Sequence, residues 1–355
     1  MYLFSQIDHI FLLLLISIVI ASTLAWISIR MAPMIELMDV PGSADHKSHH
    51  DSMPVVGGIV LLDTLILIVI IFGQWTDNTI LGILVSSIVI GLFGLWDDYK
   101  NLKVELKLLG QILGAMVLIS FGVHVNFFGS PEFLIQIDME LAHWLNILVT
   151  ILWLVTLTNA FNFIDSFDGI AAGLTTLSST FFLIISVGTG QQSMIFLCTI
   201  MLGTSTTLYY LNSHPAKLFL GDSGSQSIGF FLAAIAILYQ PLEGNQASTW
   251  FIPVLIFSVP LFDLCLVVAS RFRRGKKIHK ASRDHTYHRL EDSGFSMTRS
   301  VLIMHGISLL LSMVGYLCIN LPYIIANVVF GLVLLLGCLL YTSPSPRDAT
   351  LSRMP

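Results

Sequence analysis

Long apolar segments separated by short polar loops are the feature that most constrains the fold of this chain. A helix needs about 20 apolar residues to cross a bilayer. Eleven segments approach that length: Ile7–Ile29, Val55–Phe72, Ile80–Trp96, Leu106–Val125, Trp144–Phe163, Ile170–Val187, Ser193–Leu211, Gln226–Tyr239, Trp250–Ser270, Val301–Ile319 and Leu321–Leu340. Only 11% of the 355 residues are charged, which is too few to cover a soluble globule of this size. The sequence therefore predicts an all-α, polytopic membrane protein with about eleven transmembrane helices.

Lysine and arginine between the predicted spans occur only on alternate loops. Arg30 and Lys47 flank the first loop, and nine basic residues lie between residues 271 and 299. Four intervening loops contain neither residue type: 73–79, 126–143, 188–192 and 240–249. Because cytoplasmic loops carry the excess of Lys and Arg, we expect the N-terminus outside, the C-terminus inside and the active-site loops in the cytoplasm. We also expect the long loop 271–300 to carry a short helix.

Cysteine usage and the C-terminal segment limit the interpretation further. All four cysteines lie in apolar segments without paired spacing, so we interpret them as small buried hydrophobic residues and expect neither a disulfide nor zinc. They are Cys198, Cys265, Cys318 and Cys338. Nothing in the sequence indicates nucleic-acid binding. Residues 1–340 are interpreted as one integral-membrane domain, and residues 341–355 as a disordered or non-native tail.

Two adjacent acids, Asp97 and Asp98, end one apolar segment on the basic side. Successive residues of a helix diverge by about 100°, so one carboxylate can face a reaction while the other holds a basic partner or the backbone. A solvated helix end is the simpler alternative, although acids there oppose the helix dipole. We treat both as candidate catalytic residues, and the neighbouring Lys100 as a candidate substrate ligand.

Polar residues recur every three positions at the end of another segment, at Asn159, Asn162, Asp165 and Asp168. On a helix, Asn162 and Asp165 share a face. Carboxylates at the cytoplasmic end of a span are costly unless they bind something, so both acids are functional candidates. Asn159 can equally form a hydrogen bond between helices. Gly169 favours a helix end near Asp168, and we assign it to structure.

The run Gly221-Asp222-Ser223-Gly224-Ser225 predicts a tight turn between two spans, where glycines let a phosphate or a metal approach the backbone. Asp222 is the best candidate metal ligand. Mg²⁺ prefers oxygen ligands and keeps several waters, so one or two protein groups plus substrate phosphates suffice. An Asp that caps a helix start is the alternative.

The basic loop divides into two parts. Residues 271–280 would serve as a topology signal or bind anionic lipid headgroups. Arg283, His285 and His288 follow, and imidazoles among arginines suit a diphosphate.

Three further residues are candidates by position. Lys47 adds a cation in the first basic loop, near a Gly-rich helix start. Asp63 and Asp263 lie within apolar segments, where an acid is a functional candidate by default. The sequence names no partner for either acid.

The order of these motifs resembles the polyprenyl-phosphate N-acetylhexosamine-1-phosphate transferases over about residues 39–340. The motifs run D-x-P, H-K-x-H, P-x-x-G-G, D-D-x-K, N-A-F-N-x-x-D-x-x-D-G, F-x-G-D-x-G-S, P-x-x-D and H-x-x-H-R-L. The chain is most similar to the WecA and TagO branch, because the HHH-F-E signature of the related MraY enzymes is absent. Ser166 stands where that branch usually has Gly, and Thr286-Tyr287 interrupts its H-x-H-H pattern.

The resemblance implies transfer of N-acetylhexosamine 1-phosphate from a UDP-sugar to undecaprenyl phosphate or another polyprenyl phosphate, with release of UMP. N-acetylglucosamine (GlcNAc) is the first choice of sugar. The resemblance also implies Mg²⁺, with Mn²⁺ as an alternative. It places the reaction at the first membrane step of cell-surface polysaccharide synthesis, in the bacterial inner membrane, and is compatible with a homodimer.

Roles for particular residues follow from the same resemblance. Asp222 and Asn162 would hold the metal. Asp97 or Asp98 would orient or deprotonate the acceptor phosphate, and Asp165 is a third catalytic candidate. The residues implied in substrate binding are Lys47, Lys100, Asp168, Asn212, Phe219, Arg283, His285 and His288. Among these, Phe219 would stack on uracil, and Asn212 and Asp168 would help to hold the nucleotide.

Two alternatives stay open at the level of the sequence. Tyr287 places a bulkier, neutral phenol in the loop expected over the sugar, which favours looser preference at C6 and makes a 6-deoxy donor the runner-up. An ion-coupled transporter would place acids near the bilayer midplane and usually show repeated halves. Here most acids crowd one interface and no repeat is apparent, so the transporter is the less favoured class.

Membrane topology gives the first testable prediction. In a background without the four native cysteines, single cysteines at Ser43 and Lys280 should resist an impermeant thiol reagent in intact cells, because both lie in basic loops. A cysteine at Glu243 should label. Labelling is measured as a mass shift, with lysed cells as the control in which all three react. The reverse pattern in intact cells would contradict the predicted orientation.

Overall fold

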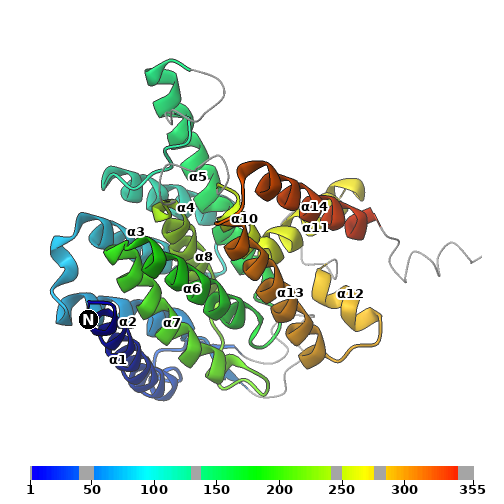
Figure 1. The fold of residues 1–355 in the computed structure, drawn as a ribbon. Coiled ribbons are helices and arrows are strands. Elements are labelled where there is room, and N and C mark those ends of the chain that lie inside the picture. The colour runs from blue at the N-terminus through cyan, green and yellow to red at the C-terminus, as the bar shows by residue number, and fades with distance from the viewer. Residues whose placement is uncertain (1, 40–51, 129–136, 241–249, 276–284, 343–355) are drawn as a thin grey trace, which may run out of the picture. The chain divides into compact units, whose positions relative to one another are not determined.

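The protein is described here from a computed structural model, in which regular structure is almost entirely helical (Figure 1). The described residues are 2–39, 52–128, 137–240, 250–275 and 285–342. The chain forms two compact units, Met1–Tyr239 and Gln240–Pro355, and each is described by itself. The prediction of an all-α membrane protein is confirmed, whereas a single domain over residues 1–340 stays a prediction.

The first unit is a helical bundle. Its α-helices are α1 (Tyr2–Met31), α2 (Gly57–Ile71), α3 (Asn78–Lys100), α4 (Val104–Ser120), α5 (Met139–Ile164), α6 (Ile170–Thr189), α7 (Gln192–Asn212) and α8 (Gly221–Leu238). A short 3-10 helix η1 (Gln74–Thr76) precedes α3, and strands β1 (Met38–Asp39) and β2 (Met53–Pro54) pair antiparallel. Helix α8 packs against α2, α3, α5, α6 and α7 and is buried along almost its whole length. It is therefore the core of this unit.

The second unit contains α10 (Ile252–Ile256), α11 (Ser258–Arg273), α12 (Thr286–Asp292), α13 (Met297–Cys318) and α14 (Tyr323–Thr342). Helix α13 packs against α10, α11 and α12. The short helix expected in loop 271–300 is α12, which confirms that prediction. Helix α14 ends at Thr342, two residues inside the segment predicted as a tail.

Among the described residues, six helices are long and apolar enough to cross a membrane: Ile7–Met31, Asn78–Lys100, Met139–Ile164, Ile170–Thr189, Gln192–Asn212 and Met297–Cys318. The predicted span Trp250–Ser270 is divided at Phe257 into α10 and α11. Pro260 lies in the first turn of α11, where its missing N–H costs nothing, and so favours a new helix start there. The total of about eleven spans stays a prediction.

Helix ends on the predicted cytoplasmic side meet at one end of the first unit. The C-termini of α3 and α5 lie beside the N-termini of α4 and α8, joined by side-chain contacts among Asp97, Lys107, Asn162 and Asp222. At another junction Asp77 caps the N-terminus of α3 and accepts a 2.7 Å hydrogen bond from Ser193 at the start of α7. The helix ends predicted to be cytoplasmic and those predicted to be external thus form two different sets of contacts, as a chain that crosses the membrane alternately up and down requires. The orientation of this bundle in a membrane stays a prediction.

Two glycines let other helices approach α8 closely. A Cβ on Gly94 of α3 would lie 2.7 Å from the amide N of Ser223, and a Cβ on Gly229 of α8 would lie 2.6 Å from the carbonyl of Leu157. Both distances are shorter than real Cβ contacts. Gly169 has a different function: it precedes α6 with φ +80°, a conformation that L-residues rarely adopt.

Hydropathy predicted the cysteine environments only in part. Cys198 and Cys318 are buried, but Cys265 and Cys338 are exposed on the protein surface, so the prediction of burial is wrong for these two. An apolar segment must leave water, and lipid can cover it as well as protein can. Several sequence-predicted positions lie outside the described residues: Lys47, Arg283, the labelling sites Ser43, Glu243 and Lys280, and tail residues 343–355.

The packing of α3 on α8 generates the second prediction. Gly94→Ala should lower the melting temperature in detergent, because the added methyl group meets the backbone of Ser223 and overpacking costs about 1–3 kcal/mol. Gly188→Ala is the matched control, since a Cβ at Gly188 meets nothing within 4 Å. A Gly94→Ala protein that melts at or above the wild-type temperature would contradict the close approach of these helices.

Candidate active site

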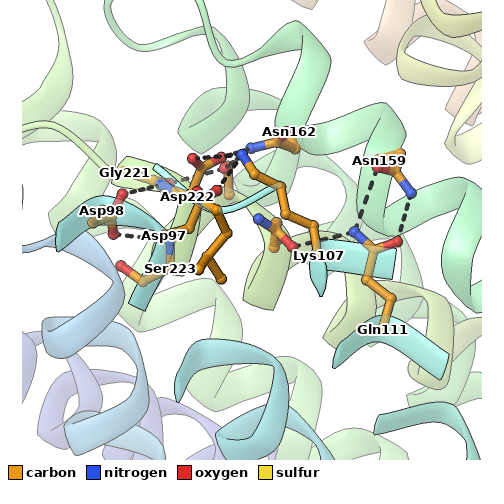
Figure 2. Close-up of polar contacts among 12 residues, drawn as sticks. Asp97, Asp98, Lys107, Gln111, Asn159, Asn162, Gly221, Asp222 and Ser223 are labelled. Atoms are coloured by element: carbon orange, nitrogen blue, oxygen red, sulfur yellow. Dashed lines mark hydrogen bonds and ion pairs between the residues drawn. The ribbon is translucent and has the colours of Figure 1, made fainter. Parts of the chain in front are cut away.

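Three of the predicted acidic residues, Asp97, Asp98 and Asp222, gather where α3, α4, α5 and α8 meet (Figure 2). Asp97 and Asp98 come from the last turn of α3, and Asp222 from the first turn of α8. Asn162 comes from the last turn of α5 and Lys107 from the first turn of α4. Residues separated by more than 100 positions in the chain therefore form one polar cluster in an apolar bundle.

Asp98 holds the start of α8. Its Oδ1 accepts a hydrogen bond from the N–H of Asp222 at 2.7 Å, and its Oδ2 accepts one from the N–H of Ser223 at 3.1 Å. A carboxylate at a helix N-terminus satisfies free amides and interacts favourably with the helix dipole. Gly221 makes the approach possible, because its φ is +71° and a Cβ there would lie 2.9 Å from Asp98 Oδ2. Asp98 thus positions Asp222.

Asp97 faces a basic partner and is almost fully buried. Its Oδ1 accepts a 2.6 Å hydrogen bond from the N–H of Leu102, and its Oδ2 forms an ion pair with Nζ of Lys107. The same Nζ lies 3.3 Å from Oδ2 of Asp222. Lys107 therefore bridges the two carboxylates.

Lys107 was not among the site residues predicted from the sequence. The sequence feature that could have identified it is the position of a lysine inside the predicted apolar segment Leu106–Val125. An ionisable residue in such a segment is a functional candidate in the same way as an acid is.

Asn162 and Asp222, the predicted metal ligands, are in direct contact. Nδ2 of Asn162 donates to Oδ1 of Asp222 and also to Oγ of Ser225 at 3.0 Å. Oγ of Ser225 in turn donates to the carbonyl of Gly221 at 2.8 Å. Burial acts to raise the pKa of Asp222, but its contacts with Asp97, Lys107 and Asn162 outweigh that effect and lower the pKa.

Asp165 and Asp168 are two further acids beside this cluster. Asp165 follows α5, and the pKa of its carboxyl is raised to about 8 by burial and by the charges of Asp222, Asp98 and Asp168. Oδ2 of Asp168 lies 3.1 Å from Nδ1 of His214. Helix α5 ends at Ile164, so Asp165 lies just beyond the helix, and the predicted shared helix face of Asn162 and Asp165 stays a prediction.

Two residues predicted to bind the nucleotide form hydrogen bonds with backbone groups of the protein. Oδ1 of Asn212 accepts from the N–H of Gly169 at 3.0 Å, and Nδ2 of Asn212 donates to the carbonyl of Leu218 at 3.0 Å. Phe219 donates its N–H to Pro54 and accepts from the N–H of Gly57 with its carbonyl. Asn212 and the backbone of Phe219 thus join the loop 213–220 to α6 and α2. A role for either in nucleotide binding stays a prediction.

Other predicted residues take no part in the contacts described above. Lys100 is exposed at the end of α3. His285 and His288 belong to the second unit, where Nδ1 of His288 lies 3.4 Å from Glu291. Asn159 forms the hydrogen bonds between helices that were one of its two predicted roles. It pairs with Gln111 of α4, which also donates to Gln226 of α8 at 3.2 Å (Figure 2).

The donor set is compatible with magnesium. Within the described residues no cluster of three or more His, Cys, Asp or Glu side chains forms a ready metal site. Asp222 offers carboxylate oxygens, whereas Asn162 faces Asp222 with its Nδ2, so its amide would have to turn for its oxygen to bind a metal. Mg²⁺ needs only one or two protein groups when it also binds phosphates. The surplus of carboxylates over Lys107 in this cluster also suits a divalent cation.

The bridge through Lys107 generates the third prediction. Lys107→Met should lower stability by about 1–3 kcal/mol, because it leaves the buried Asp97 carboxylate without its cation. Lys103→Met, at an exposed position nearby, should change stability little. Adding Asp97→Asn to Lys107→Met should restore part of the loss. Thermal unfolding in detergent measures all four proteins, and equal melting temperatures for the two lysine variants would contradict the bridge.

Comparison with known proteins gives a consistent result. Residues 80–240 match the family model for glycosyl transferase family 4. The chain is 29% identical over 283 residues to a probable undecaprenyl-phosphate N-acetylglucosaminyl 1-phosphate transferase of Bacillus subtilis, covering 80% of this chain and 77% of the relative. It is 31% identical over 254 residues to the phospho-N-acetylmuramoyl-pentapeptide-transferase of Lacticaseibacillus paracasei, covering 68% and 77%.

A third relative is also named for a polyprenyl-phosphate acceptor. The decaprenyl-phosphate N-acetylglucosaminephosphotransferase of Mycobacterium leprae is 31% identical over 242 residues, which cover 63% of this chain and 61% of the relative. The matched region contains the α3, α5 and α8 motifs that build the acidic cluster. With its motif order, its helical membrane fold and these similarities, the chain belongs to glycosyl transferase family 4, among the polyprenyl-phosphate N-acetylhexosamine-1-phosphate transferases.

Proposed function

We propose that the protein transfers GlcNAc 1-phosphate from UDP-GlcNAc to a polyprenyl phosphate, such as undecaprenyl phosphate, and releases UMP. The observation that carries this proposal is the convergence of the Asp97-Asp98, Asn162 and Asp222 motifs at one end of an apolar helical bundle. At such an end a lipid headgroup can meet a water-soluble nucleotide. The names of the Bacillus subtilis and Mycobacterium leprae relatives favour GlcNAc as the sugar.

The proposed reaction exchanges one phosphoric anhydride for another. An oxygen of the lipid phosphate forms a bond to the phosphorus that carries the sugar, and the bond from that phosphorus to the bridging oxygen breaks. The bridging oxygen leaves with UMP. A phosphate monoester has its second pKa near 6, so the acceptor is already largely a dianion at neutral pH and needs little help from a base. We therefore favour direct attack over a covalent aspartyl intermediate.

The residues of the cluster would each do a different part of this work. Asp222 and Asn162 would hold Mg²⁺, or Mn²⁺ as the alternative, which supplies charge neutralisation at the diphosphate. Asp98 would keep Asp222 in place through the α8 amides. Lys107 forms ion pairs with Asp97 and Asp222 in this structure, and its ammonium group can bind a phosphate oxygen instead.

The remaining roles extend the proposal to the nucleotide and the lipid. Asp165 would be a third acid of the catalytic cluster. Further phosphate and nucleotide contacts would come from Lys47, Lys100, Asp168, Asn212, Phe219, Arg283, His285 and His288. We also propose a bacterial inner-membrane location with the N-terminus outside, the active site facing the cytoplasm, and a place at the first membrane step of cell-surface polysaccharide synthesis. The proposal is compatible with a homodimer but does not require one.

The alternative donor, a 6-deoxy N-acetyl sugar, loses its main support. That alternative assumed that the phenol of Tyr287 lies over the sugar, but Tyr287 is fully buried and packs on the rings of His285 and His288. A transporter is likewise less favoured, because the acids of the cluster lie at helix ends instead of the middle of the spans.

The fourth prediction tests the reaction and the metal ligand together. Purified protein with polyprenyl phosphate and a panel of UDP-sugars should release UMP with UDP-GlcNAc, at a higher kcat/KM than with the 6-deoxy sugar, and chelation should stop release. Asp222→Asn should reduce turnover below about a tenth of wild type, because the substitution removes a negative charge from the metal site while it nearly keeps the volume. Glu105→Gln, at an exposed acid of the same bundle end, is the matched control and should stay active.

Two results would separate the parts of this proposal. No UMP release with any sugar would contradict the reaction itself. Full turnover by a correctly folded Asp222→Asn protein would contradict only the metal assignment.

A further inference from the structure

A buried acid of the second unit contacts the first histidine of the H-x-x-H-R-L motif. Asp263 lies on α11 and is fully buried. Its Oδ2 lies 2.7 Å from Nδ1 of His285, and its Oδ1 accepts a 2.7 Å hydrogen bond from the N–H of Thr286. Both oxygens of the carboxylate are therefore engaged by two consecutive residues at the start of α12.

The imidazole of His285 is also held by an aromatic neighbour. The rings of His285 and Tyr287 stack with centroids 5.0 Å apart and planes 16° from parallel. The hydrogen bond to Asp263 fixes rotation within the plane of the imidazole, and the stack on Tyr287 fixes its tilt. The side chain thus has one orientation imposed by two independent contacts.

This arrangement determines which ring nitrogen is left for a ligand. An ionised carboxylate only accepts hydrogen bonds, so Nδ1 of His285 carries a proton and donates it to Asp263. Nε2 is then the nitrogen that can reach a further group, and no protein partner for it is recorded in the described part of the chain. A carboxylate that orients a functional imidazole in this way is common behind ligand-binding histidines.

We propose that Asp263 is a positioning residue that presents Nε2 of His285 to a phosphate oxygen of the nucleotide sugar. The inference rests on the proposed function for the identity of the ligand. Nε2 donates to an anion such as a phosphate oxygen when both ring nitrogens carry a proton. The competing explanation is a purely structural tie between α11 and α12.

Substitutions at His285 separate these explanations without altering Asp263. His285→Asn keeps a donor near the place of Nδ1, so the bond to Asp263 and the fold are retained, but the group at the place of Nε2 is lost. His285→Gln keeps a donor nearer to Nε2 and loses the bond to Asp263. Both variants are compared with wild type for melting temperature, for kcat and for KM of UDP-GlcNAc.

Asp263→Asn is tested with Glu291→Gln as its matched control. The Asn side chain has one acceptor oxygen, whereas Asp263 uses both of its carboxylate oxygens. In Asp263→Asn, either Nδ1 of His285 or the N–H of Thr286 therefore faces an amide NH₂ group and loses its acceptor. Glu291 also lies beside a histidine of the motif, 3.4 Å from Nδ1 of His288, but its side chain is 39% exposed, against 1% for Asp263. A partly solvated pair at this distance contributes little, so Glu291→Gln should stay within about twofold of wild type.

The positioning role predicts a specific pattern. We expect His285→Asn to melt as wild type does, while its kcat/KM falls about 10–100-fold, mainly through KM. We expect Asp263→Asn to lose activity to a similar extent and Glu291→Gln to lose none. Wild-type kinetics in a folded His285→Asn protein would overturn the proposal in favour of a structural tie. Equal losses in Asp263→Asn and Glu291→Gln would also overturn it.

A readout without catalysis distinguishes this inference from the proposed function. In ¹⁵N-histidine spectra, assigned by subtraction of the His285→Asn spectrum, Nδ1 of His285 should be protonated in wild type and should lose that proton in Asp263→Asn. An unchanged Nδ1 signal in Asp263→Asn would overturn the inference even if UMP release is confirmed. The protein could instead give the expected spectra and release no UMP from any sugar. That result would support the pairing of Asp263 with His285 and would contradict both the proposed function and the phosphate ligand.

Discussion

The hydrogen bonds between the Asp98 carboxylate and the first amides of α8 determine where the other site residues lie. Helix α8 is the core of the first unit, and its N-terminal turn carries Asp222. Free amides at a helix start inside an apolar bundle are costly without a partner. Asp98 satisfies two of them from α3, and this contact brings the ends of α3 and α8 together. Lys107 and Asn162 then meet Asp222 from two further helices.

The same interaction explains why adjacent acids have different partners. Asp97 and Asp98 leave the helix in different directions, so one contacts Lys107 and the other contacts the backbone of α8. Within this set of contacts Lys107 is the one cation, against the carboxylates of Asp97, Asp98 and Asp222. A site with this excess is suited to bind a divalent cation together with phosphates, because each would compensate the charge of the other.

A similar device occurs in the second unit. Asp263, a buried acid on α11, binds the N–H of Thr286 at the start of α12, as Asp98 binds the amides of α8. In both places an acid from an apolar segment accepts hydrogen bonds from backbone N–H groups at the start of a helix that follows later in the chain. The second oxygen of Asp263 binds His285. One buried carboxylate can therefore set both the path of the chain and the direction of a side chain.

Hydropathy and motif order alone determined the helical membrane class and the family. These properties depend on the period of a helix and on residues close together in the chain. Tertiary structure decided which partner each polar group has: Lys107 for Asp97, the α8 amides for Asp98, and His285 for Asp263. It also showed that Asn212 binds backbone groups and that Tyr287 is buried. Such pairings form between residues from about 10 to more than 120 positions apart, and a pattern in one segment does not specify which distant segment will satisfy its polar groups.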